Sequence, residues 1–458
     1  MLTTERARPE PVRRSPRAWR LAVGTVCFGA FMGQLDASIV TLTYQPLRTE
    51  FHTTPAGVEW VSLSYLLTLT ALLVPVGRVS DVRGRKLMYL YGFAVFTAAS
   101  AACGLAPGLA ALVLFRVVQA LGAAMMQANS VALVTTSAPP ERMRAALGMQ
   151  AAGQALGLAL GPTVGGVLVS ALGWRWVFGV NVPIGVLALV AGHYLLPRTR
   201  QCAAGGRIDL PGVLLLGGST TAALLALSVA SGLGLPVWSA ALLGAAAAGA
   251  GWAFLRRQRS CPRPLLDLAL LRERRLGPGL LGGLCGYLVL FGPLVLVPVV
   301  LTRAGSTPLA TGLVLTALPL GFALAATGAE RLLPAAWSDG LRGRAGAAGC
   351  VAALALLVLL PAEAAVLPLP LALLGLSLGV YLPANNTQVM RAVPATAAGT
   401  GGGMVNMTRG LGTAVGVAAV TLALHLADAR TAALTLLGFA LLILATTSLA
   451  TTTTSRRS

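Results

Sequence analysis

The sequence predicts an all-α polytopic membrane protein, built from two six-helix bundles with two further helices inserted between them, fourteen transmembrane helices in total. Three observations predict this fold class. Hydrophobic residues make up 56% of the 458 residues, and the mean hydropathy of +0.79 is far above that of a soluble domain. Apolar runs of about 20 residues, long enough to cross a hydrocarbon core, recur along the whole chain. The runs fall into groups of six, two and six.

The order of the apolar runs predicts the domain organisation. The first six runs are 19–46, 57–78, 86–106, 108–136, 143–172 and 174–196. Two runs follow a polar segment, 210–231 and 236–255. The last six follow a basic segment and are 276–302, 308–330, 345–361, 364–390, 397–426 and 430–450. We therefore expect a cytoplasmic N-terminal tail (1–18), a first bundle (19–196), a linker with two extra helices (197–275), a second bundle (276–450) and a cytoplasmic C-terminal tail (451–458).

The basic residues predict the orientation of the chain in the bilayer. With the N-terminus inside, 28 of the 34 lysines and arginines fall in cytoplasmic tails and loops, as expected for a protein of the plasma membrane. A twelve-helix arrangement, in which 210–255 is peripheral, gives the same distribution, but the length of its two runs favours fourteen. The net charge of +20 does not predict nucleic acid as a partner, because no aromatic platform accompanies the basic residues.

The sequence predicts neither an enzyme nor a bound cofactor. The six cysteines form no CxxC pair, and no histidine lies at metal-ligand spacing from them. The chain contains neither a G-x-S-x-G elbow nor a P-loop, which argues against an ATP-driven pump. A membrane enzyme or a signalling scaffold is the alternative of a different class.

An internal repeat indicates that the two six-helix bundles arose by duplication. The segment "SDVRGR" (80–85) follows the second run of the first six, and "SDGLRGR" (338–344) follows the second run of the last six. We expect both segments to form charged turns. Matching turns at matching places predict two related halves.

Four segments of the chain match known sequence signatures. "GRVSDVRGRK" (77–86) matches a loop signature at Gly77, Asp81, Gly84, Arg85 and Lys86. "LVLFRVVQALGAA" (112–124) is similar to a fourth-helix motif at Arg116 and Gln119. "GMQAAGQALGLALGPTVGG" (148–166) fits a fifth-helix motif at Gly148, Gly157, Gly161, Pro162, Gly165 and Gly166. "LDASIVTLTYQP" (35–46) partly matches a first-helix signature at Leu35 and Asp36. Through these motifs the chain resembles the major facilitator superfamily, and within it the fourteen-helix drug/proton antiporter branch, whose antiporter motif is the fifth-helix one.

The resemblance implies a secondary transporter that exports a small amphipathic compound, such as a drug or an antibiotic, by alternating access. It implies the proton gradient as the energy source, no cofactor, a bacterial plasma membrane and a monomer. An importer or facilitator on the same scaffold is the alternative, which the motif at 148–166 disfavours. The resemblance also implies a latch that favours the outward-open state. In this latch Asp81 meets the positive end of the helix that begins with "TAAGTGGG" (396–403), and the neighbouring bases meet acids of the inner face. The alternative is that the basic residues only hold this loop on the cytoplasmic side of the membrane.

Asp36 and Arg116 are the candidate proton-coupling residues. Asp36 is the only carboxylate well inside a helix of the first bundle, and Arg116 lies near the middle of 108–136, where a charge costs ~2.5 to 3.5 kcal/mol on insertion scales. Burial favours the neutral form of a carboxylate and a neighbouring arginine favours the charged form, so the pair could exchange protons as water access alternates. A permanent ion pair, or an arginine bonded to backbone carbonyls, remains the alternative.

Two further groups of residues complete the predicted site. Glycines at 153, 157, 161 and 165 form a smooth stripe that could let the two halves approach closely and seal a leak path, with Pro162 adding a bend. The candidate lining of a central substrate cavity is Gln34, Gln119, Gln127, Tyr381, Asn385, Asn406 and Arg409. Ordinary hydrogen bonds between helices are the alternative role for each of them.

Overall fold

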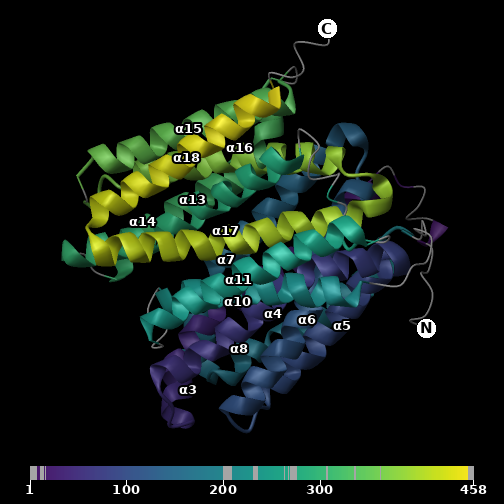
Figure 1. Cartoon of the computed structure of the whole chain (residues 1–458), viewed down its shortest axis with the longest axis horizontal. Helices are drawn as coiled ribbons and strands as arrows, with labels where there is room; N and C mark the ends of the chain where they lie inside the picture. The colour runs from purple at the N-terminus through teal and green to yellow at the C-terminus, as the bar shows by residue number, and fades with distance from the viewer. Residues whose placement is uncertain are drawn as a thin grey trace. The chain divides into compact units, whose positions relative to one another are not determined.

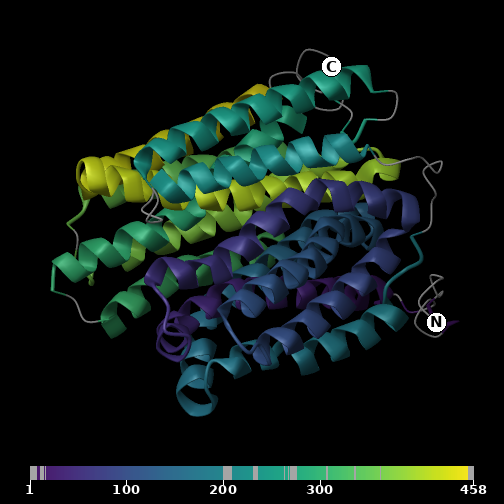
Figure 2. The ribbon, with the colours of Figure 1, turned by 60° about the horizontal axis from the view of Figure 1, so that its bottom comes forward.

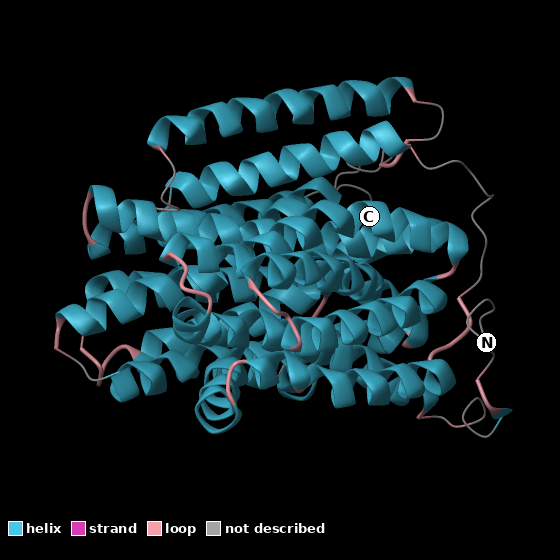
Figure 3. Ribbon diagram, turned by 90° about the horizontal axis from the view of Figure 1, so that it is seen from below, coloured by secondary structure: helices cyan, strands magenta, loops and turns pink. Residues whose placement is uncertain are grey.

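The structure is a computed structural model of the whole chain. It describes residues 8–10, 15, 17–199, 209–230, 236–261, 264–266, 268, 276–305, 308–334, 337–361 and 363–451. All regular elements in these ranges are helices (Figures 1 and 3). Most of the two predicted tails, 1–18 and 451–458, and most of 197–209 and 262–275 lie outside the described residues.

The chain packs as two compact units. Unit 1 comprises Met1–Ala223, Leu242–Asp267 and Pro394–Asn406, and unit 2 comprises Leu224–Ala241, Leu268–Val393 and Met407–Ser458. The helices of the first half are α2 (Ala18–Ile39), η1 (Val40–Thr43), α3 (Tyr44–Glu50), α4 (Pro55–Arg83), α5 (Arg85–Gly104), α6 (Leu109–Ser137), η2 (Pro140–Arg142), α7 (Met143–Leu172), α8 (Arg175–Gly179) and α9 (Asn181–Leu195). The inserted helices are α10 (Leu210–Ala230) and α11 (Val237–Ser260). The remaining helices are α13 (Leu276–Arg303), α14 (Pro308–Leu332), α15 (Asp339–Leu359), α16 (Pro368–Ala392), η3 (Ala395–Ala397), α17 (Ala398–Leu426) and α18 (Ala429–Thr451).

The helices of the described part have the length and hydropathy of fourteen membrane spans. Thirteen are candidate spans as they stand, and the fourteenth is the pair Pro140–Leu158 and Thr163–Leu172, which is bent by 42°. The break contains the sequence position of Pro162, and a proline removes a donor from a helix. The predicted fold class is confirmed, and the predicted run 143–172 coincides with α7.

Both inserted helices are long and apolar enough to cross a membrane, which favours fourteen helices over twelve. Helices α10 and α11, drawn in teal, run side by side (Figures 1 and 2), and Ser219 Oγ donates to the Ala247 carbonyl at 2.8 Å. Near their other ends the Asp209 carboxylate accepts from Arg257 Nε at 2.8 Å and from Gln258 Nε2 at 3.1 Å. Hydrogen bonds therefore join the two helices at two places along their length.

The two charged turns are shorter than the sequence predicted. Helix α4 continues to Arg83, and a single residue, Gly84 with a φ of 105°, separates it from α5. Such a positive φ suits glycine because glycine has no Cβ. Helix α15 begins at Asp339 rather than at 345, because Ser338 Oγ caps it by accepting from Leu341 N at 3.3 Å. The sequence prediction ended each helix where its apolar run ends. Both helices include charged residues beyond that run, so they are longer than predicted.

Within unit 1, helix α2 has neighbours on several sides. It packs against α7, α6 and α9, and α6 also packs against α4 and α5. Within unit 2, α16 packs against α13, α14 and α15, and α18 packs against α13 and α15. The candidate coupling residues lie on α2 and α6, so the packing of unit 1 positions them.

Candidate functional site

Asp36 lies in the last turn of α2 and is completely buried, with 0% of its surface exposed. Its Oδ2 accepts a hydrogen bond from Arg116 Nη1 at 2.7 Å. Its Oδ1 accepts from two side-chain amides, Gln119 Nε2 at 3.0 Å and Asn181 Nδ2 at 2.8 Å. The sequence therefore placed Asp36 opposite Arg116 correctly, and the structure adds two amide donors to the pair.

Arg116 lies in the first half of α6, and only 1% of its surface is exposed. Besides Asp36 it donates from Nε to the Val61 carbonyl at 3.0 Å and from Nη1 to Gln119 Oε1 at 2.6 Å. Its guanidinium carbon also lies 4.2 Å from the centre of the Tyr65 ring. A buried charge is tolerated when it is paired and hydrogen-bonded, and Arg116 meets both conditions.

Gln119 joins these groups into one polar cluster, which we call the Asp36 network: Asp36, Ser100, Arg116, Gln119 and Asn181. The Gln119 amide donates to Asp36 and to Ser100 Oγ at 2.8 Å, while its oxygen accepts from Arg116. With 0% of its surface exposed, Gln119 does not line an open cavity here, contrary to its predicted place in the substrate site. Arg116 therefore contacts a carboxylate and a backbone carbonyl at the same time.

Sequence reasoning missed Asn181 and Ser100. Asn181 is the first residue of α9, is 1% exposed and lies 145 residues from its partner Asp36. The only available signal was a polar amide inside the apolar stretch "FGVNVPIG" (178–185). An isolated polar residue does not indicate which residue it contacts, so this contact could be identified only from the structure.

A second polar cluster, which we call the Asp81 contact, lies at the turn between α4 and α5 in unit 1. Asp81 Oδ1 accepts from Gly399 N at 2.7 Å and from Arg85 Nη2 at 2.9 Å. Asp81 Oδ2 accepts from the backbone N and the hydroxyl of Thr400 at 2.9 and 2.8 Å. Gly399 and Thr400 open α17, whose free N–H groups favour a carboxylate.

The predicted members of the latch separate into two groups. Gly77 lies one helical turn before Asp81, and a Cβ there would overlap the Gly399 carbonyl oxygen, so glycine is needed for this approach. Arg85 donates to the Ala395 carbonyl at 2.6 Å as well as to Asp81. Lys86 lies elsewhere: its Nζ donates at 2.8 Å to two carbonyls at the end of α9, His193 and Leu196. Lys86 therefore caps the end of α9.

The glycine stripe packs against α2 of the same unit. A Cβ at Gly157 would overlap the Phe31 carbonyl oxygen, and Cβ atoms at Gly161 and Gly165 would overlap Ser38 and Ile39. Close helix packing is therefore confirmed, but the expectation that the stripe faces the other half is wrong, because the small residues accommodate the backbone of α2. Gly148 is buried in α7, whereas a Cβ at Gly166 would meet no atom within 4 Å.

The other candidate cavity residues of unit 1 are Gln34, Gln127 and Asn406. Gln34 is partly exposed on α2 beside Gly157. Gln127 Nε2 lies 3.3 Å from the position of a Cβ on Gly33, and the Gln127 carbonyl accepts from Asn406 Nδ2 at 2.7 Å. The Asn406 side chain thus forms a hydrogen bond between helices α17 and α6.

The candidate cavity residues of unit 2 are Tyr381, Asn385 and Arg409. Tyr381 and Asn385 line a cavity of about 10 Å³, and Asn385 Nδ2 donates to the Gly279 carbonyl at 2.9 Å. Such a volume is roughly that of one water molecule, too small for a drug. Arg409 is 7% exposed and lies close to Tyr287 of α13.

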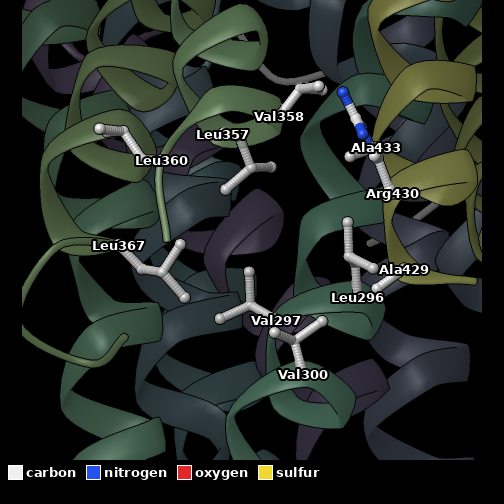
Figure 4. Close-up of a pocket in the computed structure, with 10 residues that line it drawn as sticks. All are labelled: Leu296, Val297, Val300, Leu357, Val358, Leu360, Leu367, Ala429, Arg430 and Ala433. Atoms are coloured by element: carbon white, nitrogen blue, oxygen red, sulfur yellow. The ribbon is translucent and has the colours of Figure 1, made fainter. Parts of the chain in front are cut away.

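A larger cavity of unit 2 contains none of the predicted site residues. It has a volume of about 240 Å³ (Figure 4) and is lined by Leu296, Val297, Val300, Leu357, Val358, Leu360, Leu367, Ala429, Arg430 and Ala433. Its wall is aliphatic apart from Arg430. Among the described residues, no three His, Cys, Asp or Glu side chains lie together as a metal site requires.

Comparison with known proteins identifies relatives over most of the chain. A family model described as the Major Facilitator Superfamily matches residues 26–417. The multidrug resistance protein Stp of Mycobacterium tuberculosis is 33% identical over 402 residues, which cover 85% of this chain and 73% of Stp. The riboflavin transporter RibZ of Clostridioides difficile is 28% identical over 408 residues, which cover 86% and 85%. The solved structure of the human organic anion transporter MFSD10 (TETRAN) matches with a TM-score of 0.69 at 18% identity, covering 95% of this chain and all of that one, a likeness of fold.

Proposed function

The chain belongs to the major facilitator superfamily, and from this premise we propose that it exports a small amphipathic compound in exchange for protons. The family and the matched relatives are transporters, so the chain is a multi-pass membrane transporter of small molecules and not an enzyme. The direction of transport, the coupling ion and the substrate are the content of the proposal.

Export is supported by the likeness to a protein named for multidrug resistance and by the glycine motif at 148–166. The proton gradient is the proposed energy source, with no cofactor. The protein is proposed to act as a monomer in the bacterial plasma membrane with both termini in the cytoplasm, as the distribution of basic residues favours.

The single observation that carries the proposal is the buried pair of Asp36 and Arg116. Three donors reach the Asp36 carboxylate, and one of them is the charged guanidinium of Arg116. A proton arriving from the outer side would neutralise Asp36 and so remove the counter-charge of Arg116, which keeps its hydrogen bonds to the Val61 carbonyl and to Gln119. Release of that proton to the cytoplasm would restore the ion pair. Alternating access then couples this cycle to the outward passage of the substrate.

The test is transport into inverted membrane vesicles with an imposed pH gradient. The probes are a panel of neutral and singly charged amphipathic antibiotics and dyes, compared between the wild type and Asp36→Asn. We expect gradient-driven uptake of at least one compound by the wild type and its loss in Asp36→Asn, because the asparagine cannot exchange a proton. The matched control is Asp428→Asn, whose carboxylate is exposed near the start of α18.

Two results would contradict the proposal. Uptake that still follows the gradient in Asp36→Asn would remove Asp36 from coupling. Equal loss in Asp428→Asn would show that the effect is not specific to the buried carboxylate.

A second candidate, an importer or facilitator of a metabolite, rests on the likeness to a protein named as a riboflavin transporter. Riboflavin taken up by right-side-out vesicles, with no movement of the amphipathic panel in inverted ones, would favour this candidate over export.

A further inference from the structure

The neutral form of Asp36 needs a hydrogen-bond acceptor that the observed arrangement does not supply to it. Asp36 Oδ1 receives N–H groups from Gln119 and Asn181, and Oδ2 receives one from Arg116. A protonated carboxyl group becomes a donor, and a buried donor without an acceptor is costly. Because Asp36 is completely buried, water cannot serve as that acceptor while the network is closed.

Arg116 and Gln119 cannot provide the acceptor at low cost. A guanidinium has donors only. The Gln119 oxygen already accepts from Arg116 at 2.6 Å, and its NH₂ group donates to both Asp36 and Ser100. Turning the Gln119 amide over would therefore break these three hydrogen bonds and a fourth, from Cys103 Sγ to the Gln119 oxygen at 3.8 Å.

Asn181 can provide the acceptor. Within the described part of the chain, its side chain makes one hydrogen bond, from Nδ2 to Asp36 Oδ1 at 2.8 Å. Turning this amide over breaks that bond and brings the carbonyl oxygen of the amide to the same place. The bond is then remade in the opposite sense.

We propose that the side-chain amide of Asn181 turns over with the protonation of Asp36, donating to the carboxylate and accepting from the neutral carboxyl. This inference rests on the proposed function, because it assumes that Asp36 exchanges protons. A proton from water binds Asp36 Oδ1, the N–H···O bond from Asn181 breaks, and an O–H···O bond to Asn181 forms. Arg116 stays on Oδ2 and Gln119 keeps one N–H on Oδ1. Asn181 is thus a positioning residue that holds both forms of Asp36.

The experiment uses the proton as its probe and needs no substrate. Infrared difference spectra of the purified full-length protein are recorded as the pH is lowered. The Asp36 carboxyl band is assigned by its loss in Asp36→Asn, and the Asn181 amide band is assigned by isotope labelling of asparagine and by its loss in Asn181→Leu. We expect the Asn181 amide band to change in step with the appearance of the Asp36 carboxyl band.

The possible outcomes separate this inference from the proposed function. A carboxyl band that appears while the Asn181 band stays unchanged would overturn the turning of the amide and leave proton exchange intact. If no Asp36 carboxyl band appears at any pH at which the protein stays folded, the proposed function itself fails.

Two variants keep the test independent of folding. Asn181→Leu has nearly the same shape but neither donor nor acceptor, and we expect it to slow gradient-driven uptake on the order of tenfold at every pH. Asn181→Thr offers a hydroxyl that can rotate to donate or accept, and we expect it to recover most of the rate. Asn181→Leu activity equal to wild type, or Asn181→Thr as impaired as Asn181→Leu in a folded protein, would contradict the inference.

Discussion

Replacing Asp81 by asparagine tests how strongly the start of α17 is held to the turn between α4 and α5. The Asp81 carboxylate accepts hydrogen bonds from Arg85, Gly399 and Thr400 with both of its oxygens, and its side chain is completely buried. Asparagine keeps one oxygen and points an NH₂ group at the donors on the other side. The variant therefore loses at least two hydrogen bonds to a charged group and leaves the nearly buried Arg85 without its counter-charge.

The expected loss follows from these contacts. A hydrogen bond to a charged group contributes roughly 1.5 to 3 kcal/mol, and removing one partner of a buried ion pair costs about 3 to 5 kcal/mol. We expect the free energy of unfolding of Asp81→Asn to fall by about 3 to 5 kcal/mol. The measurement is unfolding of the purified protein in detergent micelles, followed by circular dichroism as denaturant is added.

The internal repeat offers a matched control. Asp339 occupies the corresponding place in "SDGLRGR" and pairs with Arg391 Nη1 at 2.6 Å, but 53% of the Arg391 side chain is exposed. Solvent therefore screens this ion pair more than the pair of Asp81 and Arg85, whose side chains are both buried. We expect Asp339→Asn to cost less than Asp81→Asn. Equal losses in the two variants would refute the argument that the contact with α17, and not the motif itself, provides the stability.

Two further predictions test packing and charge elsewhere in unit 1. Gly157→Ala should lower the free energy of unfolding by about 1 to 3 kcal/mol, because the added Cβ overlaps the Phe31 carbonyl oxygen. Gly166→Ala, the control, should be neutral or stabilising. The same denaturation measurement compares them, and an unaffected Gly157→Ala would contradict the close packing. Burial tends to raise the pKa of Asp209, but hydrogen bonds from Arg257, the backbone of Gly212 and Gln258 outweigh it and hold that pKa below its usual value. A lowered pKa stabilises the folded state above the unfolded value of about 4, and this contribution disappears as the pH falls through the folded value. The difference in unfolding free energy between the wild type and Asp209→Asn should therefore shrink from neutral to acid pH, and a difference that grows on acidification would contradict this sign.

The sequence predicted the number and order of the helices because apolar length is a direct requirement of the bilayer. It placed the ends of α4 and α15 less well. A charged residue ends a hydropathy window, but it does not end a helix that continues beyond the apolar core. Gly84 and Ser338 set these ends through a positive φ and a side-chain cap, and both signals lay inside segments that had been expected to be turns.

The Asp36 network was predicted in part for a similar reason. Asp36 and Arg116 are charged, and charge inside an apolar run is conspicuous because of its cost. Asn181 and Ser100 are neutral, and each is compatible with many places in a helix bundle. Their role follows from how α2, α5, α6 and α9 pack against one another. This packing cannot be determined from a single sequence.

The duplicated motif makes different contacts in the two halves, and the acids are distributed differently as well. Asp81 binds the start of α17, while Asp339 binds the exposed Arg391. From residue 276 onward the acids lie at helix ends or between helices: Glu330, Asp339, Glu363 and Asp428. Among its described residues, unit 2 therefore offers no buried carboxylate in the middle of a helix to bind a proton or a cation. The proposed proton site belongs to unit 1. A substrate with several positive charges would find no carboxylate among the Tyr381, Asn385 and Arg409 side chains of unit 2, so a neutral or singly charged compound is the substrate that we propose.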